Sequence, residues 1–220
     1  MNSTMNNQIV LDKDTLIVRN KVLRQTYQLL SATLLFSSLC AYAGMVMNIG
    51  RINPWIYFGV FIGLVLAIQA KRNSGMGVVL LFALTGFMGF ALSSTMNMLV
   101  VSMNAGGVVV KALLGTAIIF AGLSAYVLKT GTNFKFLGGY LFCALIVGIL
   151  ASLGMALFGM TGGQVAISAL FLLVFSGYVL YDTSAIIHGD QDNYILATLD
   201  LFLDIYNIFV QLLNIFASRD

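Results

Sequence analysis

The chain has 220 residues; 60% are hydrophobic, 9% are charged, and the mean hydropathy is +0.96. Soluble domains carry about 25% charged residues, so the composition excludes a soluble globular protein and predicts a polytopic membrane protein. The net charge of +3 comes mostly from residues that flank apolar segments, which does not favour nucleic-acid binding.

The first 24 residues are polar and mixed in charge, and they contain no short apolar region followed by a small-residue cleavage site. We therefore expect no removable signal peptide. Residues 1–24 are predicted to form a flexible cytosolic tail that precedes the first membrane span.

Seven apolar runs follow, and each is long enough to cross a bilayer. The connections between them are short and marked by Gly and Asn, which favour turns. We predict an all-α integral membrane protein, with a seven-transmembrane-helix bundle over residues 25–216 and a C-terminal tail over 217–220. The runs cover residues 25–47, 54–70, 76–98, 108–128, 134–158, 164–187 and 193–216.

Small residues inside the runs predict how closely the helices approach each other. The pairs Gly59/Gly63 and Gly86/Gly89 would each allow two helix backbones to come together. Cys40 and Cys143 both lie in apolar runs, so we interpret them as small hydrophobic residues that form neither a disulfide nor a metal site.

The distribution of Lys and Arg predicts the orientation in the membrane. With the N-terminus inside, eight basic residues lie on the cytoplasmic side and three on the other, which favours a cytoplasmic N-terminus. The last run leaves one alternative open, because a polar stripe is also compatible with a re-entrant segment. The two sets are Lys13, Arg19, Lys21, Arg24, Lys71, Arg72, Lys129 and Lys135, against Arg51, Lys111 and Arg219.

The last run carries a polar stripe made of Asp200, Asp204, Asn207, Gln211 and Asn214. Their spacings of 4, 3, 4 and 3 place them on one face of a helix. A charged Asp near the bilayer centre costs about 2.5–3.5 kcal/mol, so the stripe should face other helices or a wet cavity. The three amide residues would be hydrogen-bond partners between helices or, alternatively, the lining of a pathway.

Asp182 in the sixth run could meet the carboxylates of the seventh. Asp182 and Asp204 lie roughly 8 and 16 Å from the same membrane face, with Asp200 between them, and a short loop joins the two helices. Two carboxylates within about 4 Å would hold one proton between them near neutral pH, and its loss would drive the helices apart. Such a pair would be a pH sensor and a candidate Ca²⁺ site. Alternatively, Asp182 and Asp200 stay hydrated near the surface and Asp204 makes a structural hydrogen bond.

Three further residues near this membrane face have two interpretations each. His188, at the end of the sixth run, is either a cation stabilised by the helix dipole or a proton relay to the carboxylates. Lys71 and Arg72 are either topology anchors or a counter-ion for Asp182.

Two segments resemble the signature of the Bax-inhibitor-1 family, whose members are also called transmembrane Bax inhibitor motif proteins. They are Gly177–Thr183 (GYVLYDT) and Leu199–Phe209 (LDLFLDIYNIF), and the resemblance covers residues 20–216. Similarity to the bacterial YccA-type branch of this family comes from Lys21–Tyr27, Leu137–Gly139, Ile186–Gly189, Asn193–Ile195 and Phe216–Asp220.

The resemblance implies a seven-helix bundle whose last helix is central, with Asp182 and Asp204 as a di-aspartyl pH sensor that controls a calcium leak. The YccA-type branch implies a protein of the bacterial inner membrane that binds and modulates the membrane AAA protease FtsH through its N-terminal tail. Some family members hold the sixth-helix Asp with an Arg from the second helix. The run 54–70 contains neither Lys nor Arg, which leaves Lys71 or Arg72 for that role.

These patterns leave two functional hypotheses, a modulator of FtsH and a pH-sensitive calcium or cation leak channel. Neither is an enzyme, and neither requires a cofactor beyond Ca²⁺ as the transported ion. An intramembrane aspartyl protease would need Gly-x-Gly-Asp at its second carboxylate. The chain has Leu201-Phe202-Leu203-Asp204 there, so we reject proteolysis.

Overall fold

The computed structural model describes the backbone of residues 2–102, 105–159 and 162–218, and side chains from residue 20 onward except that of Ser102. Across these residues the chain is helical and contains no strand, which confirms the all-α prediction. Seven helices are long and apolar enough to cross a membrane. They are α1 (Asn2–Val46), α2 (Pro54–Lys71), α3 (Gly75–Asn97), α4 (Gly106–Thr130), α5 (Leu137–Phe158), α6 (Gln164–His188) and α7 (Tyr194–Ala217), with a π-helical turn η1 (Met98–Ser102) after α3.

The helix ends follow from local chemistry. Pro54 occupies the first turn of α2, where its missing N–H leaves no bond unmade. The side chain of Asn53 caps the same helix by accepting a hydrogen bond from the backbone N–H of Trp55 at 2.9 Å. Helices α4, α5 and α6 each end at a glycine with positive φ, namely Gly131, Gly159 and Gly189. Glycine reaches this left-handed conformation without a steric penalty.

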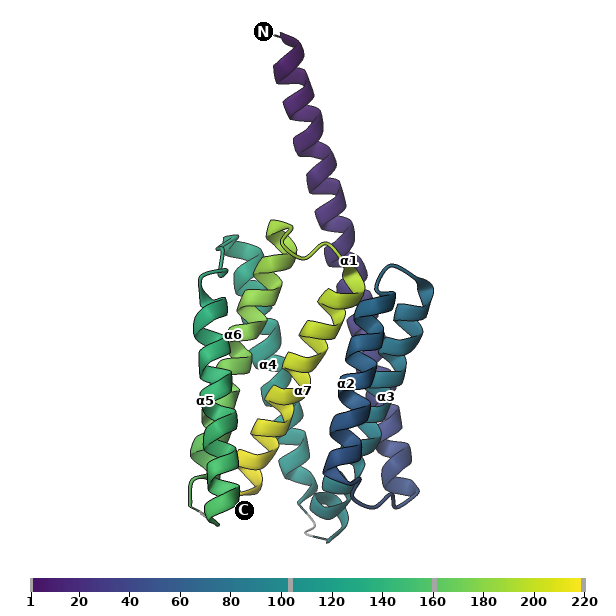
Figure 1. Cartoon of the computed structure of the whole chain (residues 1–220), viewed down its shortest axis with the longest axis vertical. Helices are drawn as coiled ribbons and strands as arrows, with labels where there is room; N and C mark the ends of the chain where they lie inside the picture. The colour runs from purple at the N-terminus through teal and green to yellow at the C-terminus, as the bar shows by residue number, and fades with distance from the viewer. Residues whose placement is uncertain (1, 103–104, 160–161, 219–220) are drawn as a thin grey trace.

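Helix α1 extends far beyond the bundle on its N-terminal side (Figure 1). Residues 1–24 are predicted to form a cytosolic tail, and in their described part the backbone is helical from Asn2 and runs unbroken into a span that begins at Asn20. Residues 2–24 contain neither Pro nor Gly, so polar composition alone does not interrupt the helix.

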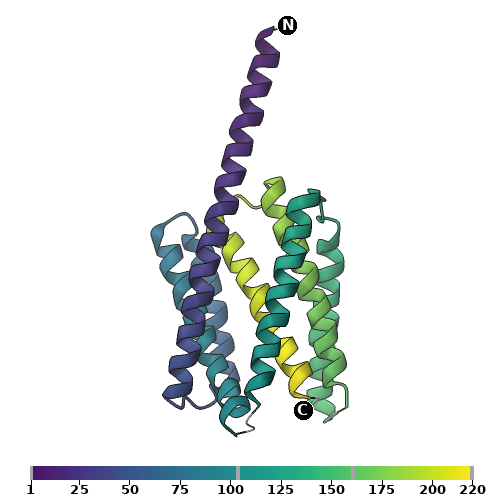
Figure 2. The same ribbon diagram turned by 180° about the vertical axis from the view of Figure 1, so that it is seen from behind.

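The other six helices form two groups around α7 (Figures 1 and 2). Helices α1, α2 and α3 pack together on one side, and α4, α5 and α6 pack on the other. Helix α7 crosses obliquely between the groups and contacts α1, α3, α4 and α6. It is the most buried of the seven spans, which confirms the predicted central position of the last helix.

The two halves of α7 pack against different partners. The first half, including Leu201 and Phe202, joins a core cluster built mainly from α1, α2 and α3. The second half, including Ile208 and Leu212, joins a second cluster with α4, α6 and η1. Helix α7 runs the full depth of the bundle and ends on the side opposite the N-terminus (Figure 1), which favours a span over the re-entrant alternative.

The glycine pairs behave differently from one another. A Cβ added at Gly89 would collide with the backbone oxygen of Ser37, and one at Gly86 would lie 2.7 Å from the ring of Phe36. These glycines therefore permit the close packing of α3 against α1. Gly59 and Gly63 have no atom within 4 Å of an added Cβ, so the predicted close approach at this pair is wrong.

Candidate functional site

Three carboxyl groups lie together in the bundle, as the sequence predicted. Asp182 comes from α6, and Asp200 and Asp204 come from α7. Asp204 is 4% exposed, and the other two are partly buried. Asp182 and Asp204 lie within hydrogen-bonding reach of each other, and Asp200 is close enough to interact electrostatically with both.

A favourable contact between Asp182 and Asp204 would require a proton. Two ionised carboxylates have only acceptor atoms, and the Oδ2 atom of Asp204 is buried without a donor. One proton placed between the groups would convert a repulsive contact into a hydrogen bond that joins α6 to α7. We name Asp182, Asp200 and Asp204 the carboxylate cluster.

The α6–α7 loop provides a hydrogen bond to the side chain of Asp200. The side-chain amide of Gln191 donates a hydrogen bond to Asp200 Oδ2 at 3.3 Å. The Gln191 Oε1 atom accepts from the backbone N–H of Asn193 at 3.4 Å. Gln191 is therefore the loop residue that joins the α6–α7 loop to the cluster.

The side chain of Asn193 makes two sets of hydrogen bonds, one to the first turn of α7 and one to the turn between α2 and α3. Its Oδ1 atom accepts from the backbone N–H groups of Ile195 and Leu196, at 3.0 and 3.1 Å. Its amide nitrogen donates to the carbonyl of Arg72 and to Oδ1 of Asn73, both at 3.0 Å. The cap residue of α7 is thus hydrogen-bonded to the turn between α2 and α3.

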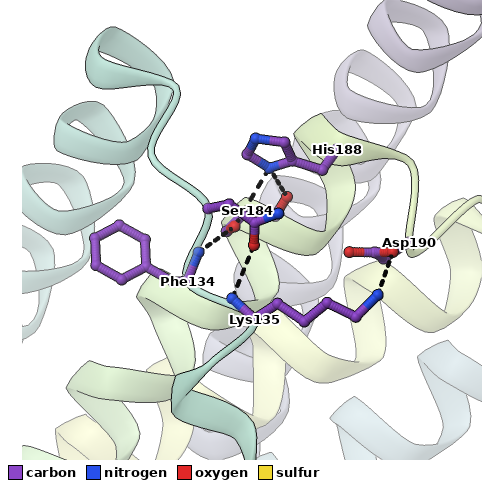
Figure 3. Close-up of polar contacts among 6 residues, drawn as sticks. Phe134, Lys135, Ser184, His188 and Asp190 are labelled. Carbon is purple, nitrogen blue, oxygen red and sulfur yellow. Dashed lines mark hydrogen bonds and ion pairs between the residues drawn. The ribbon is translucent and has the colours of Figure 1, made fainter.

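The imidazole of His188 contacts Ser184 of its own helix, next to the α4–α5 loop (Figure 3). Its Nδ1 atom lies 2.8 Å from the carbonyl of Ser184 and 3.4 Å from the hydroxyl of the same residue. That hydroxyl accepts a hydrogen bond from the backbone N–H of Phe134 at 2.9 Å. The structure does not bring His188 to a carboxylate of the cluster, so the geometry does not provide the predicted proton relay.

Lys71 and Arg72 also stay away from the cluster. Where the structure describes side chains, the ion pair found joins Lys135 to Asp190 at 2.9 Å, and none joins Lys71 or Arg72 to Asp182. Both residues lie at the exposed corner between α2 and α3, where they line a shallow surface pocket. The predicted counter-ion role is therefore not realised in this conformation.

The rest of the polar stripe leads away from the cluster toward the opposite end of the bundle. Asn207 donates to the carbonyl of Leu203 in its own helix at 2.8 Å. Gln211 and Asn214 line a cavity of about 550 Å³ between α5, α6 and α7. Asn214 also lines a second cavity of about 520 Å³ that faces α2 and α3. The amide stripe therefore connects the bundle centre with two partly polar cavities.

A metal ion would find few protein ligands here. In the described parts of the chain, no group of three or more His, Cys, Asp or Glu side chains is arranged to hold a metal. Ca²⁺ takes six to eight oxygen ligands. Asp182 and Asp204 would supply carboxylate oxygens, and the remaining ligands would have to be amide or backbone oxygens and water.

Two residues of the site were not predicted from sequence. Asn193 directly precedes an apolar helical run, which is the usual signal of an N-cap. Gln191 has no such signal, because its contact with Asp200 depends on how the loop folds back over α7.

A family model and several bacterial relatives each match most of this chain. The family described as "Inhibitor of apoptosis-promoting Bax1" matches residues 19–220. An uncharacterized protein of Pseudomonas aeruginosa is 46% identical over 195 residues, covering 89% of this chain and 88% of the relative. The protein named "Modulator of FtsH protease YccA" of Escherichia coli K12 is 40% identical over 211 residues, covering 95% and 96%. An uncharacterized protein of Campylobacter jejuni is 38% identical over 203 residues, covering 89% and 87%.

Proposed function

The chain belongs to the family of inhibitors of apoptosis-promoting Bax1, in the bacterial branch that includes YccA, and on this premise we propose that it modulates the membrane protease FtsH. The observation that carries the proposal is the 40% identity with a relative named as a modulator of this protease, over nearly the full length of both chains. We infer a multi-pass protein of the inner membrane, since another relative is named an inner membrane protein. We also infer that it acts by binding and not by catalysis, since the relative in E. coli K12 is named a modulator of a protease.

The long first helix supports this proposal. Residues 2–19 continue α1 beyond the bundle by about 27 Å at 1.5 Å per residue. Lys71, Arg72, Lys129 and Lys135 lie at the same end of the bundle, which favours a cytoplasmic location for this end. We therefore propose that the projecting part of α1 contacts the protease on the cytoplasmic side.

Deletion of residues 2–19 tests the contact. In cells that overproduce the full chain, we expect a slower turnover of a membrane substrate of FtsH than in cells without it. The shortened chain should accumulate in the membrane with an unchanged melting temperature, because its seven spans remain, but it should not change substrate turnover. A chain in which an unrelated helical segment of equal length replaces residues 2–19 controls for length. Full modulation by the shortened chain would exclude the projecting helix as the contact.

The carboxylate cluster favours a second candidate function, a proton-controlled leak for Ca²⁺ or other cations. A proton shared by Asp182 and Asp204 would hold α6 against α7. Its release would leave neighbouring negative charges that repel each other and attract a cation. The amides of Gln211 and Asn214, on the same face of α7, would continue the path toward the opposite membrane surface.

Ca²⁺ flux into proteoliposomes between pH 6 and pH 8 tests this candidate. We expect Asp182→Asn and Asp204→Asn to remove the pH dependence, while Asp192→Asn, which changes an exposed loop carboxylate, should leave it unchanged. Wild-type flux in both cluster variants would exclude the leak. Deletion of residues 2–19 separates the two functions, because the leak should persist without the projecting helix.

A further inference from the structure

The loop between α6 and α7 is bonded to both helix groups of the bundle. This loop, residues 189–193, begins at Gly189, where a positive φ of 80° ends α6. It ends at Asn193, the cap of α7. We name it the strap, because it covers the end of the bundle beneath which the carboxylate cluster lies.

One end of the strap is tied to the α4–α5 loop, which belongs to the group α4–α6. The ammonium group of Lys135 lies 2.9 Å from Oδ1 of Asp190 (Figure 3). The backbone N–H of Asp190 donates to the carbonyl of Ala185 at 2.9 Å, which folds the start of the strap onto α6.

The other end of the strap is tied to the group α1–α3. The amide nitrogen of Asn193 donates to the carbonyl of Arg72 and to Oδ1 of Asn73 in the α2–α3 turn, both at 3.0 Å. The strap therefore bridges the two groups between which α7 passes.

The middle of the strap reaches the carboxylate cluster. Gln191 donates to Asp200 Oδ2 at 3.3 Å, and its own backbone N–H donates to the carbonyl of Ala185 at 3.1 Å. A change in the position of the strap would therefore move the hydrogen-bond donor of Asp200.

We propose that the strap is a latch over the carboxylate cluster, in which the Lys135–Asp190 ion pair holds the strap closed and Gln191 is the positioning residue for Asp200. Any effect of the latch on ion flow depends on the cation leak proposed above. The closure of the strap by the ion pair is independent of that proposal. Opening the ion pair would release Gln191 from Asp200 and loosen the tie between the two helix groups.

The ion pair suits a latch because it is weak. The Lys135 side chain is 66% exposed and that of Asp190 is 37% exposed. Ion pairs of this kind change an equilibrium by a factor of about two to five. Segments that open in function come from the least stable parts of a fold.

Hydrogen exchange of the full chain in lipid nanodiscs tests the latch. We expect Lys135→Gln and Asp190→Asn each to accelerate exchange at the amides of residues 190–196 by about two- to five-fold. The charge swap that combines Lys135→Asp with Asp190→Lys should restore the wild-type rate. Lys129→Gln is the matched control, because it removes an exposed lysine at the same end of the bundle. Wild-type exchange in both single variants would overturn the latch.

A double-mutant cycle on Ca²⁺ flux at pH 7 tests the role of Gln191. Gln191→Met keeps the size of the side chain but removes the donor, and it should change the flux of the wild type. It should have no further effect in the Asp200→Asn background, because Gln191 acts through Asp200. Effects that simply add would overturn this role. If the wild type conducts no Ca²⁺, the leak function and the positioning role of Gln191 are both wrong, whereas the exchange measurements still decide on the latch.

Discussion

Asp182 of α6 and Asp204 of α7 place their carboxyl groups within hydrogen-bonding reach of each other, and no described cation forms an ion pair with either. Like charges in such a place are costly, since water is largely excluded and Asp204 is 4% exposed. A shared proton would remove the repulsion and add a bond between the two helices. The pair is therefore a contact between α6 and α7, and we propose that its protonation alters the packing of α7.

Substitution of Asp204 should separate these two roles. Asp204→Asn offers an amide donor to Asp182, so we expect the free energy of unfolding to stay within about 1 kcal/mol of the wild type. Asp204→Ala leaves Asp182 without this partner and should cost about 1–3 kcal/mol. Thermal unfolding in detergent at pH 7 measures both. Equal losses of stability in the two variants would contradict a hydrogen bond between the carboxyl groups.

Asn193 allows its two functions to be removed one at a time. Asn193→Asp keeps the acceptor for the N–H groups of Ile195 and Leu196 but loses the donors to Arg72 and Asn73. We expect Asn193→Ala to cost about 1–2 kcal/mol, because the cap and the donors are both lost. Asn193→Asp should cost less in unfolding free energy, while hydrogen exchange in the α2–α3 turn should accelerate equally in both variants. Unchanged exchange in that turn would show that the tie to α2 and α3 is unimportant.

Gly89 and Gly59 form a matched pair of helix glycines in different surroundings. Gly89→Ala would push α3 away from the backbone of Ser37 on α1, and overpacking of this kind costs about 1–3 kcal/mol. Gly59→Ala meets open space, so its better helix propensity should leave the stability unchanged or raise it by up to about 1 kcal/mol. Melting temperatures of the two variants check this difference in sign. Tolerance of Gly89→Ala would mean that α1 and α3 can separate without loss.

The sequence was sufficient for the parts of this fold that the bilayer constrains. Seven apolar runs predicted seven spans, and the cost of burying charge predicted that Asp200 and Asp204 face other helices. Gly59/Gly63 was mistaken because a glycine pair shows that close approach is possible, but not whether a neighbouring helix lies on that side. Of the two interpretations given for His188 and for Arg72, the structure does not provide the proton relay or the counter-ion, because residues at helix ends take their direction from the loops. The contact of Gln191 with Asp200 was missed for the same reason.

The pH dependence of the latch follows from the Lys135 side chain. Its hydrogen bond to Asp190 and the negative charge of that residue raise the pKa of Lys135 above the ordinary value of about 10.4. When a cationic group has a higher pKa in the folded state than in the unfolded state, its contribution to stability is complete at any pH below the unfolded-state pKa. The contribution disappears as the pH rises through the raised pKa. Deprotonation of Lys135 should therefore leave the latch intact between pH 7 and pH 9 and release it only above about pH 10.4.

Melting temperatures of the wild type and Lys135→Gln between pH 7 and pH 11 check this expectation. The difference in Tm between the two should be constant up to pH 9 and should shrink toward zero at the alkaline end. Lys135→Arg is the matched control, because a guanidinium group stays charged throughout this range and should retain the stability that the wild type loses. A difference that already declines between pH 7 and pH 8 would mean that another group controls the strap. The carboxylate cluster beneath Gln191 would then be the first place to look, because Asp200 accepts its hydrogen bond from the strap.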